Sequence, residues 1–128
     1  MDERQWYEIK AQAGAAEVYI YEQIGEDLFG EGVTAKNFVS ELAALDVVSI
    51  ALHVNSPGGS VFDGQAIYNA LVRHPATVTT YIDGVAASIA VVVALAGDRV
   101  VMARNALFMV HDPFAPLVGT ASDHRRWP

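Results

Sequence analysis

Ser88 is the residue in this sequence whose type and setting best suit covalent chemistry. A β-branched run at residues 78–82 predicts a buried strand, and Asp83-Gly84 predicts a turn after it. The apolar run at residues 86–96 predicts a buried helix, with Ser88 in its first turn. A hydroxyl there lies beside unpaired backbone N–H groups and the positive end of the helix dipole, which suits a nucleophile whose attack creates an oxyanion. The alternative interpretation is that Ser88 only caps the helix.

Two other features are expected near Ser88. Gly58-Gly59 follows the strand predicted at residues 47–54, and glycines there allow positive φ and leave backbone N–H groups open to donate to an oxyanion. His111 ends the apolar strand predicted at residues 106–110, where it can serve as a base. Each also has a structural interpretation, as a flexible loop and as a packed histidine.

The combination of these three features is more specific than any one of them. In open α/β folds, ligands bind beyond the carboxyl ends of the strands, where all three features fall. Gly58-Gly59 can supply an oxyanion hole, Ser88 a nucleophile and His111 a base, as serine hydrolysis requires. The Gly-x-Ser-x-Gly pattern of the α/β-hydrolases is absent, and no His/Asp cluster has metal-ligand spacing. We therefore expect neither a metal nor a cofactor.

Strands and helices alternate along the sequence, which predicts an α/β fold with a largely parallel sheet. At 128 residues the chain is expected to form one domain, 1–128. Thr34 is expected to cap the first helix. The predicted strands are residues 6–9, 17–24, 47–54, 78–82, 99–103 and 106–110, and the predicted helices are residues 35–45, 61–73 and 86–96.

Composition narrows the classes of partner. The formal charge of −7 argues against nucleic acid and anionic membranes, and the absence of cysteine excludes disulfides. The polar N-terminus is unlike a secretory signal, and the longest apolar run, residues 85–96, is shorter than the about 20 residues that span a bilayer. These features predict a soluble cytoplasmic protein. The 52% hydrophobic content predicts that other subunits cover part of its surface.

At these residues the sequence resembles the ClpP family of serine peptidases. The matching motifs are Asn-Ser-Pro-Gly-Gly-Ser (55–60), Asp-Gly-Gln-Ala-Ile-Tyr (63–68), Gly-Val-Ala-Ala-Ser (84–88) and Met-Val-His (109–111). Residues 19–21, 32–35, 62–64 and 111–113 resemble the head-maturation (prohead) proteases of tailed phages and prophages. The resemblance covers roughly residues 16–123.

The resemblance implies a ClpP/crotonase-like fold of repeated β-β-α units. It implies that Ser88 is the nucleophile, that His111 is the general base, and that the backbone N–H groups of Gly58 and Ile89 form the oxyanion hole. It also implies that an extended substrate adds as a strand between two segments of the enzyme, and that the subunits form rings. Those substrate-binding segments are Gly59, Ser60, Val61 and Phe62 on one side, and Pro113 and Phe114 on the other.

One departure from the family concerns the triad acid. The family's aspartate lies a few tens of residues after the histidine, beyond a handle helix, whereas this chain ends 17 residues after His111 (128 − 111). The handle helix is expected to begin near Thr120 and to be cut off. Asp112 is a poor substitute, because neighbouring side chains on a strand point to opposite faces. We therefore expect a truncated chain with impaired peptidase activity that forms a single ring or a smaller oligomer.

The leading functional hypothesis is a serine endopeptidase that cleaves capsid or scaffold proteins during phage head maturation, in the bacterial cytoplasm or the procapsid. One alternative is a non-catalytic assembly or scaffold protein that keeps the fold. Another is an acyl-CoA enzyme of the crotonase fold. A membrane-associated signal-peptide peptidase with a Ser–Lys dyad is disfavoured, because Lys10 and Lys36, the two lysines of the chain, both lie upstream of the serine motif.

Overall fold

The strands have alternating buried and exposed side chains, as expected for a sheet with helices packed on one face. In β2 (Ala15–Tyr21) and β3 (Ser49–Ser56), every second side chain is buried. Successive side chains of a strand point to opposite faces, so these strands press one apolar face against a covering layer. The computed structural model describes residues 5–25, 35–111 and 116–119, with the backbone alone for His111 and residues 116–119.

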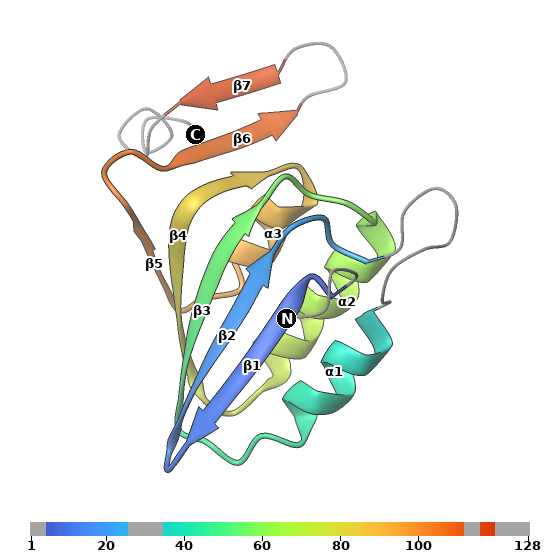
Figure 1. Ribbon diagram of the computed structural model, residues 1–128, viewed down its shortest axis with the longest axis vertical. Helices are drawn as coiled ribbons and strands as arrows, with labels where there is room; N and C mark the ends of the chain where they lie inside the picture. The colour runs from blue at the N-terminus through green and yellow to red at the C-terminus, as the bar shows by residue number, and fades with distance from the viewer. Residues whose placement is uncertain (1–4, 26–34, 112–115, 120–128) are drawn as a thin grey trace.

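Among the described residues, seven strands form one mixed sheet in the order β1-β2-β3-β4-β6-β7, and β5 pairs with β4 beside this path (Figure 1). Strands β2, β3 and β4 are parallel, as are the β4–β5 and β4–β6 pairs, whereas β1–β2 and β6–β7 are antiparallel. The remaining strands are β1 (Tyr7–Gln12), β4 (Thr77–Ala87), β5 (Arg99–Met102), β6 (Leu107–His111) and β7 (Pro116–Gly119).

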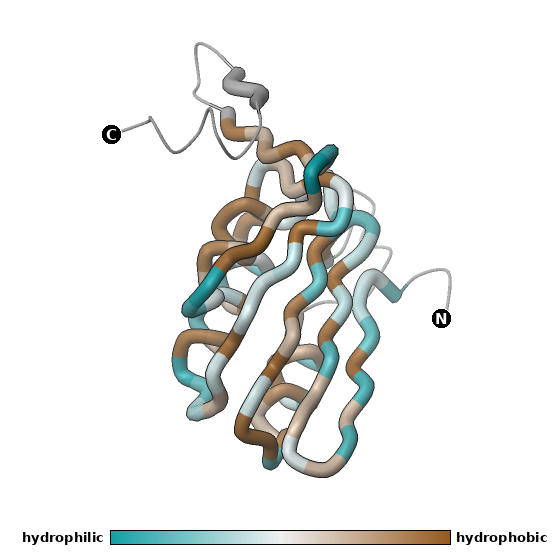
Figure 2. Tube along the Cα trace, turned by 90° about the vertical axis from the view of Figure 1, so that its left-hand side faces the viewer, coloured by the Kyte–Doolittle hydropathy of each residue, from teal (hydrophilic) through white to brown (hydrophobic). Residues whose placement is uncertain are grey.

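In the described part of the chain, three helices cover one face of this sheet: α1 (Ala35–Ala43), α2 (Val61–Arg73) and α3 (Ile89–Ala94). Phe38 and Leu42 of α1 and Ile67 and Leu71 of α2 are fully buried in the core between the layers. Figure 2 looks onto the opposite face of the sheet, where hydrophilic and hydrophobic residues alternate along the strands. None of the described helices is long and apolar enough to cross a membrane.

The predicted fold class is confirmed, and the bounds of α2 match the predicted helix at residues 61–73. The predicted turn at Asp83-Gly84 is wrong, because β4 continues through these residues to Ala87. The predicted helix at residues 86–96 is correspondingly shortened to α3, which begins only after Ser88. Pairing with β6 holds the preceding residues, 85–87, in the strand. Thr34, the expected cap of α1, and Thr120 lie outside the described residues.

Side chains at the start of α2 connect the two longer helices. The Ser60 hydroxyl accepts a hydrogen bond from the Asp63 amide at 3.2 Å, so Ser60 is the N-cap of α2. The Asp63 carboxylate in turn accepts from the Ala35 amide at 3.0 Å, and so holds the first turn of α1. The beginnings of α1 and α2 are therefore fixed to each other.

The crossing of α2 and α3 depends on Gly64. A Cβ atom at Gly64 would lie 2.2 Å from Cγ1 of Ile89, far inside van der Waals contact. The missing side chain therefore lets α2 pack directly on the first residue of α3. Because Ile89 follows Ser88, this contact also limits where Ser88 can lie.

Replacing Gly64 by alanine tests this contact. Alanine gains about 1 kcal/mol of helix propensity, whereas overpacking costs about 1–3 kcal/mol. Because the overlap with Ile89 is severe, we expect Gly64→Ala to lower the free energy of unfolding by about 1–2 kcal/mol. Urea denaturation measures it, with the exposed neighbour Gln65→Ala as a control that stays within about 0.5 kcal/mol of the original chain. A Gly64→Ala protein more stable than the original would contradict this packing.

Candidate active site

Ser88 lies between β4 and α3 in an unusual backbone conformation. Its φ is 57° and its ψ is −129°, one of two positive φ values among the described non-glycine residues. Such conformations cost of order 1–3 kcal/mol and cluster at functional sites. The surrounding bonds hold Ser88 there, since its amide donates to the Met109 carbonyl at 3.1 Å and its carbonyl accepts from the Val91 amide at 3.0 Å.

The hydroxyl of Ser88 is not used as a helix cap. Ser88 occupies the N-cap position of α3, yet its side chain makes no capping hydrogen bond. The residue is also exposed, although the residues on either side of it, Ala87 and Ile89, are buried. The structure thus places Ser88 just before the helix and leaves its hydroxyl open to a ligand, which the capping interpretation does not explain.

Gly58 packs directly against Ser88. A Cβ atom at Gly58 would lie 2.8 Å from the Ser88 Cβ and 2.9 Å from the Ala87 carbonyl oxygen. The φ of Gly58 is +112°, a conformation that side-chain-bearing residues rarely adopt. Two independent constraints therefore require glycine here: the positive φ, and the close approach of the 58–59 loop to Ser88.

The buried Ser56 side chain holds this loop from behind. Its Oγ donates to the Glu22 carbonyl at 2.6 Å and accepts from the Gly58 amide at 3.1 Å. The predicted oxyanion role of Gly58 stays a prediction, and in the structure its N–H donates to the Ser56 Oγ. Ser56, which lies at the end of β3, is a supporting residue that the analysis of the sequence did not single out.

Ile24 holds the same loop from the side. Its amide donates to the Gly58 carbonyl at 2.7 Å, and its carbonyl accepts from the Ser60 amide at 3.0 Å. Gly59, with a φ of +145°, lies between these two bonds, and a Cβ there would come within 2.3 Å of the Ile24 carbonyl oxygen. The bridge leaves the N–H of Gly59 without a hydrogen-bond partner among the described residues.

Among the described residues, two backbone N–H groups next to Gly58 and Ser88 in the sequence have no partner. One is the N–H of Gly59, and the other is the N–H of Ile89, which opens α3 and has no partner in the described part of the chain. Helix-opening amides and glycine amides of this kind bind anionic oxygen well. The predicted role of Ile89 stays a prediction, and Gly59 offers an alternative donor within the glycine pair.

The backbone of His111 ends at the same edge of the sheet. Ala87 is the register partner of Met109, and His111 follows two residues later at the end of β6. Strands β3, β4 and β6 run parallel with their carboxyl ends at this edge (Figure 1). Gly58, which follows β3, packs on Ser88, which follows β4, and the Ser88 amide bonds to Met109, two residues before His111. Pro113 and Phe114, expected to bind substrate, lie outside the described residues.

The other expected substrate-binding residues open α2 beside this edge. Ser60 is its N-cap, and Val61 and Phe62 form its first turn. The Phe62 side chain is 85% exposed and Val61 is 51% exposed, so both present apolar surface to the solvent. Among the described residues, no group of His, Asp and Glu can hold a metal ion.

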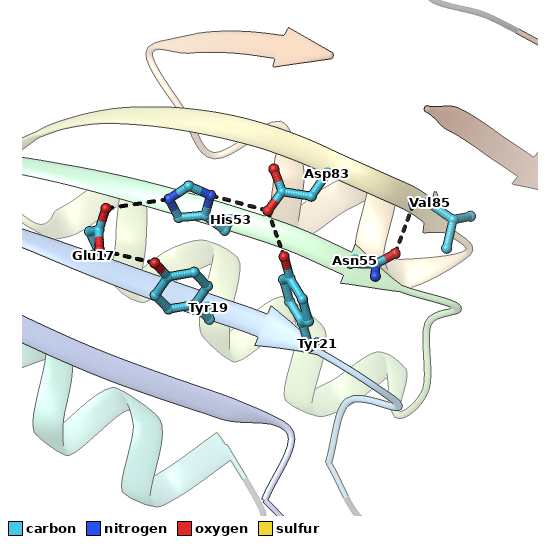
Figure 3. A network of polar contacts seen from close by, with 7 residues as sticks. All are labelled: Glu17, Tyr19, Tyr21, His53, Asn55, Asp83 and Val85. Atoms are coloured by element: carbon cyan, nitrogen blue, oxygen red, sulfur yellow. Dashed lines mark hydrogen bonds and ion pairs between the residues drawn. The ribbon is translucent and has the colours of Figure 1, made fainter. Parts of the chain in front are cut away.

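A bulge in β4, absent from the sequence-based prediction, lies just upstream of Ser88. Val54 pairs with Ile82, but Ser56 pairs with Ala86, so β4 has two more residues than β3 across this interval. Figure 3 shows Asn55 pointing at the bulge, where its Oδ1 accepts from the Val85 amide at 3.0 Å. The Asp83-Gly84 pair that indicated a turn belongs to this bulge.

Asp83 is held on the open face of the sheet. Its Oδ2 accepts from the Tyr21 hydroxyl at 2.7 Å and lies 3.1 Å from Nδ1 of His53 (Figure 3). The His53 ring stacks between Tyr19 and Tyr81, with ring centroids 4.6 and 5.2 Å away. Because a carboxylate accepts only, the contact with Asp83 assigns the proton of a neutral His53 to Nδ1.

Partial burial and the hydrogen bond to Asp83 raise the pKa of Tyr21 from 10.0 to about 12. A raised folded-state pKa means that the stabilisation by the neutral phenol is complete below pH 10 and is lost as the pH approaches 12. We expect Tyr21→Phe to be less stable than the original chain at pH 8, with a difference that shrinks towards pH 12. Urea midpoints across this range measure it. A difference that stays constant with pH would contradict the assigned bond.

Comparison with known proteins identifies the family of this chain. The family model for Clp protease matches residues 2–126. The chain belongs to the Clp protease family. It is 39% identical over 85 residues to the ATP-dependent Clp protease proteolytic subunit 1 of Mycobacterium leprae, a match that covers 64% of this chain and 42% of that protein. The proteolytic subunit of Bacteroides fragilis is 33% identical over 142 aligned positions, covering 90% of this chain and 68% of that one. The chain thus spans about two fifths of the length of the mycobacterial Clp subunit.

Solved structures confirm the expected ClpP/crotonase-like fold. A ClpP1 variant from Listeria monocytogenes superposes with a TM-score of 0.64 at 26% identity, over 77% of this chain and 57% of that one. An enoyl-CoA hydratase from Shewanella pealeana gives a TM-score of 0.62 at 13% identity, over 84% of this chain and 50% of that one. At 13% identity this similarity shows a shared fold and is no evidence for acyl-CoA chemistry in this chain.

Proposed function

We propose that this chain is a serine-type endopeptidase subunit with Ser88 as its nucleophile. The observation that carries the proposal is the conformation of Ser88. Its backbone has a positive φ and packs against Gly58, and its exposed hydroxyl does not cap α3. Membership of the Clp protease family, whose relatives are named as proteolytic subunits, supports the same reaction. In this reaction a serine and a histidine carry out the proton transfer and the attack without a metal ion.

The proposed reaction uses three parts of this edge. His111 takes the proton of Ser88 as the Oγ atom attacks the scissile carbonyl carbon, and the carbonyl oxygen becomes an oxyanion. The N–H groups of Ile89 and Gly59 donate to that oxyanion. His111 then gives the proton to the leaving amine as the C–N bond breaks, and water hydrolyses the acyl-enzyme by the same steps in reverse.

An extended peptide is the proposed substrate. The segment Gly59–Phe62 offers a free amide and exposed apolar side chains along one side of Ser88. A peptide added there as a strand takes a main-chain hydrogen bond from the Gly59 amide, because Val61 and Phe62 already form the first turn of α2. The side chains of such a peptide alternate between its two faces. Pro113 and Phe114 are the proposed second side of this groove.

Substitution of Ser88 tests the proposed reaction directly. We expect a fluorophosphonate probe to label one residue, Ser88, and Ser88→Ala to abolish labelling without lowering the urea midpoint, because an exposed hydroxyl that does not cap the helix contributes little to stability. In a full-length enzyme the same change costs about 10⁴–10⁶ in kcat. The exposed Ser40→Ala in α1 is the matched control. Labelling that survives in Ser88→Ala would overturn the assignment, and a wild-type chain that is never labelled would favour the non-catalytic scaffold alternative.

The substrate class we propose is the capsid or scaffold protein of a tailed phage, cut during head maturation. The resemblance of residues 19–21, 32–35 and 62–64 to the prohead proteases supports this finer assignment. The proposed location is accordingly the cytoplasm of the bacterial host or the procapsid. We also propose self-association into a ring, supported by the exposed apolar side chains Val92, Leu95, Val100 and Leu107.

Co-expression tests the proposed substrate. The gene that encodes this chain, extended to its natural stop, is expressed with the neighbouring capsid and scaffold genes, and the products are compared by mass spectrometry. We expect defined cleavage of a capsid or scaffold protein that disappears when Ser88 is replaced by alanine. Intact capsid and scaffold proteins beside an enzyme that cleaves a generic peptide would contradict the head-maturation role while leaving the peptidase assignment in place.

A further inference from the structure

The bulge of β4 is the structural feature that decides where Ser88 lies. Upstream of it, β4 pairs with β3 in regular register up to Val54 and Ile82. Downstream of it, Val85–Ala87 pair with β6, and Ser88 follows with its amide on Met109. Any change in the shape of the bulge therefore moves Ser88 relative to the 58–59 loop, which is fixed separately to Ile24 and Ser56.

Asn55 joins these two parts through its side chain. It is the β3 residue that lies opposite the bulge, and its Oδ1 takes the hydrogen bond of the Val85 amide that a regular ladder would give to a backbone carbonyl (Figure 3). Its own carbonyl accepts from the Glu22 amide at 3.3 Å. Asn55 therefore satisfies the backbone of the bulge from the same strand that carries the Gly58-Gly59 loop.

Gly84 supplies the space for this bond. A Cβ atom at Gly84 would lie 2.5 Å from Oδ1 and 3.1 Å from Cγ of Asn55. The φ of Gly84 is not in the positive region that favours glycine, so the absence of a side chain, and not backbone freedom, is what this position needs. Gly84 and Asn55 thus act as one unit.

We propose that Asn55 is a positioning residue for Ser88, acting through the amide of Val85. It touches neither the substrate nor the reacting atoms. Its carboxamide oxygen fixes the length and path of β4 across the bulge, and this sets the Ser88 side chain against Gly58 and beside the Ile89 amide. Asp83, at the start of the bulge, contacts Tyr21 and His53 on the open face of the sheet. The Val85 amide bonds instead to Asn55. This proposal rests on the proposed role of Ser88.

Two single variants and their combination test the coupling. Asn55→Ala removes the acceptor, and Gly84→Ala pushes the same carboxamide off the Val85 amide. We expect each to slow fluorophosphonate labelling of Ser88, per folded molecule, by at least tenfold. The double variant is expected to be no slower than Asn55→Ala, because residues that act through one contact are not additive. Asn55→Asp keeps an oxygen acceptor in place and is expected to label within about threefold of the original chain.

Two measurements separate positioning from general destabilisation. Ile50→Val, buried near the opposite end of β3, is the control for lowered stability, and we expect it to label at the original rate. Amide hydrogen exchange is expected to become faster in residues 85–89 of Asn55→Ala but to stay unchanged in β1 and β2. This exchange is measured without the probe, so it tests the role of Asn55 even if the original chain is never labelled. Absence of labelling in the original chain would count against the proposed peptidase activity alone.

The proposal is overturned by any of three results. The first is that Asn55→Ala is labelled at the original rate per folded molecule. The second is that the effects of Asn55→Ala and Gly84→Ala on the labelling rate multiply in the double variant. The third is that amide exchange in residues 85–89 is unchanged in Asn55→Ala. If Asn55→Ala does not fold, Gly84→Ala and Asn55→Asp carry the test, and equal losses in these two would also overturn it.

Discussion

The close contact between Gly58 and Ser88 is the constraint on which the candidate site depends. With only 2.8 Å available for a Cβ atom, the loop after β3 and the turn after β4 touch through backbone and one serine side chain. The loop is fixed by Ser56 and Ile24, and Ser88 is fixed by Met109 and by the first turn of α3. The contact therefore joins two separately held parts of the fold, which allows the energetically costly backbone of Ser88 to persist.

Glycines recur wherever elements of this site approach one another. The missing side chain of Gly64 makes room for Ile89, that of Gly84 for the Asn55 carboxamide, and that of Gly59 for the Ile24 backbone. In each case the added Cβ would collide with an atom of a partner that lies far away in the sequence. The site is thus a set of close approaches between β3, β4, α2 and α3, and its geometry follows from small residues more than from any ion pair or metal.

The sequence predicted the order and type of most elements because burial dominates them. The apolar faces of β3 and α2 were readable from their periodicity. The β4 bulge was not readable, because Asp83-Gly84 has the composition of a turn, and only the partner Asn55, 28 residues earlier, shows that the strand continues. The engagement of the Gly58 amide by Ser56 was missed for the same reason, since it depends on where Glu22 places its carbonyl. Strand β7 was not predicted because it pairs only with β6 at the sheet edge.

The crystal structure of a fluorophosphonate adduct would test the central claim most directly. We predict a covalent bond from the Ser88 Oγ to phosphorus, a positive φ at Ser88, and the phosphonyl oxygen within about 2.7–3.1 Å of the Ile89 and Gly59 amide nitrogens. The Gly58 amide should remain on Ser56. A phosphonyl oxygen that faces solvent would contradict the proposed oxyanion hole. So would a phosphonyl oxygen bound by the Gly58 amide, released from Ser56, instead of by the Gly59 amide.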